Sequence, residues 1–190
     1  MLRRPILLLS ALLTLLAGLP AEADQVGDWN QALLDSIRAE RTPPPRASRS
    51  IALLNTTLFD TINGVEQQFE GYAITVPAEP DTSAEAALAT AGFEVMAELY
   101  PTRAALFATL RDTQLAAIPD GTAKTNGIGW GEFCATVSIA LREDDGANAT
   151  VDYGAPDGAG WWVRTPPAFA NPLLPQWPNV RPWTMSSGGQ

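Results

Sequence analysis

The stretch that decides the fold is GIGWGEF, residues 127–133, because it is compatible with two very different structures. Its three glycines resemble a nucleotide-binding loop, but that loop needs a strand before it and a helix N-terminus after it. Neither is expected here. Gly127, Gly131 and Ala135 instead recur every four residues, which clears one helix face for close approach by a neighbour. The spacing therefore predicts a tightly packed helix pair.

A long helix is predicted around this stretch, from Asp120 to Asp145. Its large apolar side chains recur on one side at helical spacing, and they are Trp130, Phe133, Val137 and Leu141. Gly146 is well placed to cap its end, because glycine tolerates the left-handed conformation of a C-terminal cap.

Two more helices are predicted near the N-terminus, separated by Thr42-Pro43-Pro44-Pro45. Their apolar stripes are Trp29, Leu33, Leu34 and Ile37 in the first, and Ile51, Leu54, Leu58 and Ile62 in the second. Asn63-Gly64 offers a residue that tolerates a positive φ where the second helix closes. Residues 67–80 are expected to be extended or irregular and not part of a sheet.

Two further helices have start signals. Thr82-Ser83-Ala84-Glu85 has the form of a capping box. In this motif the side chains of Thr82 and Glu85 each accept a hydrogen bond from an unpaired backbone amide at the helix start. Pro101 suits the first turn of the next helix. The two apolar faces are Leu88, Val95, Met96 and Leu99, then Leu106, Phe107, Leu110 and Ile118. About five amphipathic helices with short connections predict an all-α bundle over residues 24–146.

Residues 147–190 are predicted to be an irregular segment rich in Pro, Gly and Trp. Its most unusual part is TPPAFANPLLPQW, residues 165–177, which is too apolar for a solvated linker. The prolines are irregularly spaced, unlike a ligand for a proline-binding groove. We expect a stiff apolar strap that lies on a surface and leads toward a further part of the protein.

Residues 1–23 are predicted to be a signal peptide that directs the protein out of the cytoplasm, to the periplasm or the exterior. Arg3 and Arg4 precede an apolar run, and Ala21-Glu22-Ala23 has the form of a cleavage site. The twin-arginine route is a weaker alternative, because its flanking pattern is missing. The run is too short to span a bilayer comfortably, so no stable membrane span is expected after cleavage.

Cleavage before Asp24 would leave 10 basic and 20 acidic side chains, a net charge of −10. Such a chain is expected to repel nucleic acid and anionic membranes. Cys134 has no partner for an internal disulfide and is expected to be a buried thiol, with an intermolecular bridge as the alternative.

The chain contains no histidine. Histidine is the usual general base and the commonest metal ligand, so its absence removes the usual way to activate a serine or threonine nucleophile. Chemistry based on carboxylates alone, as in glycoside hydrolysis, stays open.

Three groups of residues are candidate sites, each with a structural alternative. Arg38, Arg41, Arg46 and Arg49 either bind a phosphate-like anion or are surface charge at a helix end. A second group offers oxygen ligands for calcium but lacks the ligand order of an EF-hand, so a solvated helix end followed by turns is the favoured alternative. Its members are Asp144, Asp145, Asn148, Asp152 and Asp157. Asn55 and Asn148 fit the glycosylation sequon, although Asn55 is expected within a helix.

Three ordered blocks resemble a known family: DWNQALLDSIRAERTPPPRASRSIALLNTTLFDTING, then IPDGTAKTNGIGWGEFCATVSIALREDDG, then WWVRTPPAFANPLLPQWPNVRPWTMSS. They resemble the N-terminal half of exported vanadium-dependent haloperoxidase-like proteins, which belong with the type 2 phosphatidic acid phosphatases. The resemblance implies a helical bundle and an oxyanion pocket in the C-terminal half, where histidines, Lys and Arg hold vanadate or a phosphoryl group. That pocket's motifs are absent here, and Arg181-Pro182 belongs to the block before them.

No catalytic, cofactor-binding or metal-binding residue is therefore predicted in this chain, and vanadate is expected only in full-length relatives. We expect a non-catalytic front half of a haloperoxidase-like protein, inactive alone, with exposed apolar stripes that drive self-association. The alternative is an exported helical interaction module that binds a partner, such as a separately encoded catalytic half.

Overall fold

The computed structural model describes residues 25–154 and 158–188, and within these residues the chain is all-α. Five α-helices occur there, with no strand: α2 (Gln25–Ala39), α3 (Pro44–Glu66), α4 (Ala84–Leu99), α5 (Ala104–Ala116) and α6 (Thr122–Glu143). Two 3-10 turns accompany them, η1 (Pro101–Arg103) and η2 (Trp177–Asn179). The all-α prediction is confirmed, while the predicted signal peptide, residues 1–23, lies outside the described residues.

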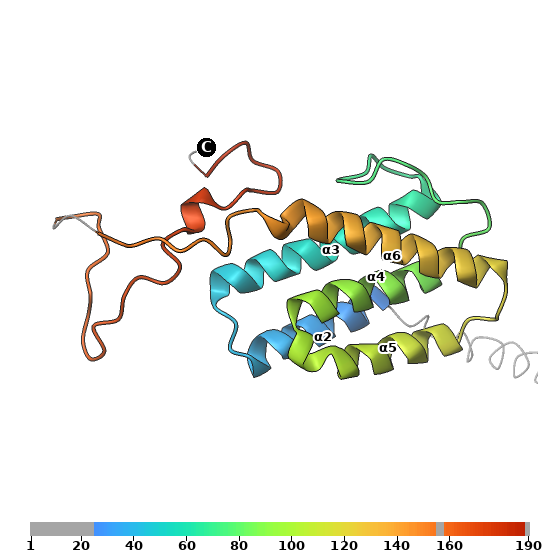
Figure 1. The fold of residues 1–190 in the computed structure, drawn as a ribbon, viewed down its shortest axis with the longest axis horizontal. Helices are drawn as coiled ribbons and strands as arrows, with labels where there is room; N and C mark the ends of the chain where they lie inside the picture. The colour runs from blue at the N-terminus through green and yellow to red at the C-terminus, as the bar shows by residue number, and fades with distance from the viewer. Residues whose placement is uncertain (1–24, 155–157, 189–190) are drawn as a thin grey trace, which may run out of the picture.

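The centre of the helical body is α4, which contacts α2, α3, α5 and α6 (Figure 1). Alanines at positions 86, 87, 89 and 91 are buried, and Val95 and Met96 extend the same core. Because the alanine side chains are small, the backbones of neighbouring helices come close to α4. Trp29 of α2 is fully buried, and its indole packs directly on Gly92.

The predicted close helix pair is α4 with α6. A Cβ atom on Gly127 would lie 2.7 Å from Cβ of Ala86, and one on Gly131 would lie 2.8 Å from Cβ of Thr90. Real Cβ atoms do not approach so closely, so glycine is required at both positions. Ala135, the third member of the series, is also buried. The prediction from the spacing is confirmed.

The large apolar side of α6 is not its buried side. The buried positions are Gly127, Gly131, Cys134, Ala135, Ser138 and Arg142, whereas Phe133 is 43% and Leu141 39% exposed. We call Trp130, Phe133, Val137 and Leu141 the α6 ridge. Leu34, Ile51 and Leu106, which were predicted within apolar faces, are exposed in the same way.

Three predicted helix ends are wrong in detail. Ser83, not Thr82, caps α4. Its hydroxyl oxygen accepts a hydrogen bond from the backbone amide of Ala86, with 3.1 Å between oxygen and nitrogen. Gln67, not Gly64, takes the left-handed conformation after α3. Gly64 lies within the helix, and the ring of Trp130 lies against it and leaves no room for a side chain. Gly146 has a φ of 90°, but α6 ends before it, with Asp144 as its C-cap.

Residues 67–80 form no strand, as predicted. The described part of the chain also holds no helix with the length and apolar character that crossing a membrane requires.

Beyond α6 the chain leaves the helices in a long excursion and then returns (Figure 1). Residues 158–171 are all exposed, and burial begins again at Gln176. We call residues 158–175 the arm and residues 176–188 the docked segment. The expected strap, residues 165–177, therefore does not lie on the described helices along most of its length. The chain meets the body only where that stretch ends.

Candidate functional site

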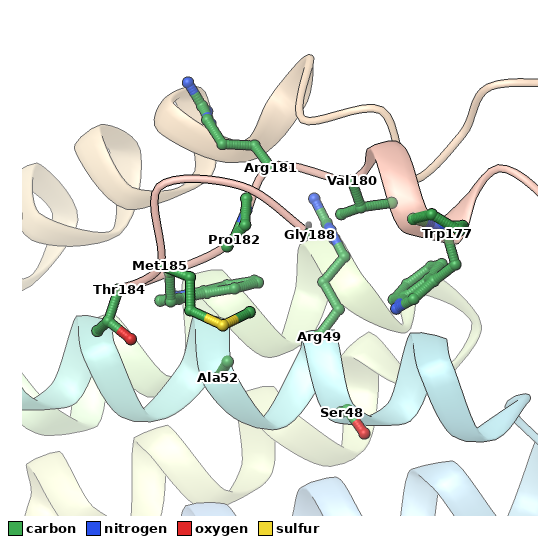
Figure 2. Close-up of a pocket in the computed structure, with 12 residues that line it drawn as sticks. Ser48, Arg49, Ala52, Trp177, Val180, Arg181, Pro182, Thr184, Met185 and Gly188 are labelled. Atoms are coloured by element: carbon green, nitrogen blue, oxygen red, sulfur yellow. The ribbon is translucent and has the colours of Figure 1, made fainter. Parts of the chain in front are cut away.

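The docked segment and the N-terminal half of α3 line a groove with a volume of about 710 Å³. Figure 2 shows Arg49 rising from α3 toward the segment, with Met185 above Ala52. The lining residues are Ser48, Arg49, Ala52, Trp177, Pro178, Val180, Arg181, Pro182, Trp183, Thr184, Met185 and Gly188. Most of them are apolar, so the groove suits an apolar group.

Arg142 fastens the docked segment to α6. This arginine is only 3% exposed, although it lies within a helix. Its Nη1 donates to the carbonyl oxygens of Arg181 at 2.9 Å and Pro182 at 3.2 Å. Its guanidinium carbon lies 3.7 Å from the centre of the Trp183 ring, which adds a cation–π contact. Its Nε has no hydrogen-bond partner.

Tyr72 joins this cluster from the loop after α3. Its hydroxyl accepts a hydrogen bond from Nη2 of Arg142 at 2.6 Å and donates one to the carbonyl of Trp183 at 2.8 Å. Asp60, a buried residue of α3, positions the loop, because its carboxylate accepts the amides of Tyr72 at 2.6 Å and Ala73 at 2.8 Å. Backbone amides thus satisfy the buried carboxylate without a cation.

Asp145 and Arg49 close the other end of the cluster. Nε of Arg49 lies 2.7 Å from Oδ2 of Asp145, whose side chain is 1% exposed. Nη2 of Arg49 also donates to the carbonyl of Arg142 at 2.7 Å, one of the carbonyls that α6 leaves free at its C-terminus. The backbone oxygen of Asp145 accepts the amide of Arg181 at 2.8 Å. We call Arg49, Asp60, Tyr72, Arg142, Asp145 and Trp183 the arginine hub.

The groove has the chemistry of a binding surface. Its lining includes no carboxylate, thiol or imidazole. The hydroxyl of Ser48 donates to the carbonyl of Pro44 at 3.1 Å, and the guanidinium of Arg49 is engaged in the hub. No pair of a nucleophile and a base therefore faces the groove.

The four arginines predicted as a group do not converge on one point. Arg38 pairs with Asp35 at the surface. Arg46 donates to Asn148 at 3.0 Å and to the carbonyl of Ala147 at 3.3 Å. With Arg49 in the hub, both Arg46 and Arg49 join α3 to the residues after α6. Neither of the two alternatives from the sequence describes Arg46 and Arg49, because these two arginines form neither an anion site nor free surface charge.

The acidic stretch is also divided. Asp145 is buried and paired, Asn148 accepts from Arg46, Asp144 and Asp152 are exposed, and Asp157 lies outside the described residues. Across residues 25–154 and 158–188, no group of three or more Asp, Glu, Cys or His side chains could hold a metal ion. The calcium alternative gains no support.

Two single-residue predictions fare better. Asn55 lies within α3, as expected, and exchanges amide hydrogen bonds with Asn30 of α2 at 2.9 and 3.1 Å. Cys134 is a free, fully buried thiol, as predicted. Burial, with the nearby charge of Asp60, raises the pKa of this thiol to about 12, although a hydrogen bond with Thr61 opposes the shift.

Vanadate does not fit the residues that the structure brings together. The anion requires several converging cationic donors around an open space. In the arginine hub, Arg142 donates to backbone carbonyls and to Tyr72, and Arg49 is neutralised by Asp145. We therefore assign no step to vanadate in this chain.

The sequence reasoning missed Arg142, Asp60 and Tyr72. One signal was available for Arg142, which follows Gly131, Ala135 and Ser138 on the buried face of α6 at helical spacing. A charge on such a face needs buried partners. Nothing local identified Asp60 or Tyr72, because their partners lie elsewhere in the fold.

Comparisons with protein-family models, with curated proteins and with solved structures find no match to this chain.

Proposed function

We propose that this chain is the non-catalytic helical part of an exported protein similar to vanadium-dependent haloperoxidases and type 2 phosphatidic acid phosphatases. It supports the rest of such a protein and carries no oxyanion site of its own. The three ordered sequence blocks support the family. The observation that carries the non-catalytic role is the use of Arg49 and Arg142 as structural clamps in a chain without histidine.

The test is an activity assay on the purified chain. With vanadate, peroxide and bromide, we expect a phenol-based dye to be oxidised no faster than in the control without protein. We expect the same for hydrolysis of a phosphomonoester. Because Arg46, Arg49 and Arg142 already donate to protein oxygens, adding vanadate should also produce no binding heat in calorimetry. Dye oxidation above the control that rises with protein concentration would overturn the proposal.

A second candidate is an exported interaction module that binds a partner through helix faces. The exposure of Phe133 and Leu141 on α6, and of Ile51 and Phe59 on α3, favours it. Large apolar side chains at this exposure become favourable contacts once a partner covers them. The expected partner is a separately encoded catalytic half or another helical surface. Affinity capture with the purified chain tests whether it binds such a partner as a separate protein.

A further inference from the structure

The arm is an apolar segment that no other described part of the chain covers. Trp161 is 52%, Trp162 51% and Phe169 57% exposed, and Val163 and Leu173 are exposed as well. Its hydrogen bonds are local: Trp162 donates its amide to the hydroxyl of Tyr153, and Phe169 donates to the carbonyl of Thr165. Such a concentration of exposed aromatic side chains marks an interaction surface.

The backbone of the arm suits contact with another surface. Pro166, Pro167, Pro172 and Pro175 have no amide proton and restrict φ, so the arm loses little conformational freedom and hides few free donors when it is covered. Ordering costs reduce the net affinity of a flexible segment. A proline-stiffened arm keeps more of the free energy from its aromatic contacts.

Charge indicates what kind of surface the arm meets. Residues 158–190 contain Arg164 and Arg181 but no Asp or Glu, although the whole chain has a formal net charge of −9. The negative charge therefore lies entirely before the arm. The arm itself carries one charged side chain, Arg164, so this aromatic and weakly basic segment is complementary to an acidic apolar surface and unlike the rest of its own chain.

The helical body presents such a surface in the α6 ridge. Phe133 and Leu141 are large and exposed, and Trp130 stacks on Phe133 with ring centres 5.4 Å apart. Glu132 and Glu143 are exposed on the same helix. By helical spacing these glutamates point to a different side of α6 from the ridge, so the ridge offers apolar contacts and the acidic helical body as a whole offers the complementary charge.

The arm of one molecule does not cover its own ridge. It leaves the body beyond the C-terminal end of α6 and extends away from the helices (Figure 1). A second copy related by a two-fold axis would receive the arm on its ridge and return its own arm in exchange. Such an isologous interface closes at two molecules.

The available area is sufficient for a stable dimer. A buried aromatic side chain covers roughly 150–250 Å², and the arm residues are about half exposed, so two arms on two ridges would bury on the order of 1,500 Å². Stable interfaces between proteins have about this size. We infer that residues 158–175 form an exchange arm that packs on the α6 ridge of a second copy of this chain.

The experiment measures mass by light scattering after size-exclusion chromatography, across a range of micromolar concentrations. The arm variant is W161S with W162S, and the ridge variant is F133S with L141S. We expect each to weaken the dimer by at least about tenfold, because each removes the aromatic or apolar contacts of both copies. The matched control is L106S, which removes an exposed apolar side chain of α5 and should leave the dimer unchanged.

Mixing the two variants makes the test specific. A mixed dimer keeps one intact pair, the arm of the ridge variant on the ridge of the arm variant, so the mixture should associate more strongly than either variant alone. A mixture that stays monomeric would overturn the inference, as would a wild-type chain that is monomeric throughout. Circular dichroism confirms that each variant remains helical.

A lipid surface is the alternative contact for exposed tryptophans. The same variants distinguish lipid binding from dimer formation. If W161S with W162S lost binding to phosphatidylcholine vesicles but kept the wild-type mass, the arm would be a lipid contact and the inference would be wrong. Loss of the dimer without change in vesicle binding supports it. The absence of dye oxidation, expected for every variant, tests the proposed function separately.

Discussion

Arg142 shows how one residue can determine where a distant segment lies. Its position on the buried face of α6 takes a charge away from water, which is unfavourable unless the donors find partners. The partners are the carbonyls of Arg181 and Pro182 and the hydroxyl of Tyr72. A polar residue that breaks the apolar pattern of its helix face therefore holds the C-terminal segment in place.

Cys134 provides a prediction at the residue scale. The pKa of its thiol is raised to about 12 in the folded protein because burial disfavours the thiolate. The neutral thiol therefore contributes fully to stability below the ordinary pKa of 9.0, and this contribution is lost as the pH rises from there toward about 12. The loss should not exceed about 1.4 kcal/mol per pH unit.

Urea unfolding between pH 8 and pH 11 measures the effect, with Cys134→Ala as the control because it removes the titrating group. We expect the wild type to lose more unfolding free energy than the variant as the pH rises. The native thiol should also react much more slowly with iodoacetamide at pH 8 than the unfolded chain does. Equal pH slopes for the two proteins would contradict the prediction.

At the scale of elements, α6 has two faces with different purposes. The small face packs on α4, whereas on the ridge Phe133 and Leu141 are exposed and Trp130 packs on Gly64 of α3. Helical periodicity identified both faces. It did not reveal that the side with the large apolar residues stays partly exposed, because the depth of contact depends on the alanines of α4 and not on hydrophobicity alone.

Gly131 and Gly129 give a matched pair of substitutions in this helix. Gly131→Ala would bring a Cβ within 2.8 Å of Cβ of Thr90 and 3.0 Å of the amide nitrogen of Ala91, so we expect a loss of about 1–3 kcal/mol. Gly129→Ala meets nothing within 4 Å. Its better helix propensity should raise stability by up to about 1 kcal/mol.

The measurement is the midpoint and slope of urea unfolding for the two variants and the wild type. Opposite signs for the two changes are the expected result. A stabilising Gly131→Ala would mean that α4 and α6 are farther apart than described.

At the scale of the whole molecule, the Arg49–Asp145 pair connects distant parts of the chain. Arg49 lies near the start of α3, Asp145 follows α6, and the backbone of Asp145 holds Arg181 of the docked segment. The pair is mostly buried, with side-chain exposures of 16% and 1%. Removing one partner of a buried pair leaves the other charge uncompensated.

A double-mutant cycle tests this connection. We expect Arg49→Met or Asp145→Asn alone to cost about 3–5 kcal/mol, and the double variant to cost less than the sum, with a coupling of about 1–3 kcal/mol. The exposed pair Arg38–Asp35 is the control, and its coupling should stay below about 1 kcal/mol. Equal coupling in both cycles, from urea unfolding, would show that the buried pair does not hold these elements together.

Local signals were sufficient for some features and not for others. Periodicity and proline positions predicted the helices and the irregular loop after α3. Start and stop signals misplaced the caps by one to three residues, since Ser83 and Gln67 take the roles expected of Thr82 and Gly64. The arginine hub was not predicted, because Arg49, Asp60, Tyr72 and Arg142 meet only after the helices have packed.

The sequence by itself determined the all-α class, the close contact of Gly127 and Gly131 with a neighbouring helix, and the buried state of Cys134. These features follow from side-chain size and spacing within one helix. Only the tertiary structure decided that Arg46 and Arg49 are clamps, that Phe133 and Leu141 of the α6 ridge stay exposed and that the arm stands apart from the helices. Each of these three features depends on which residues far apart in the chain meet in space, and a local sequence pattern does not specify such contacts.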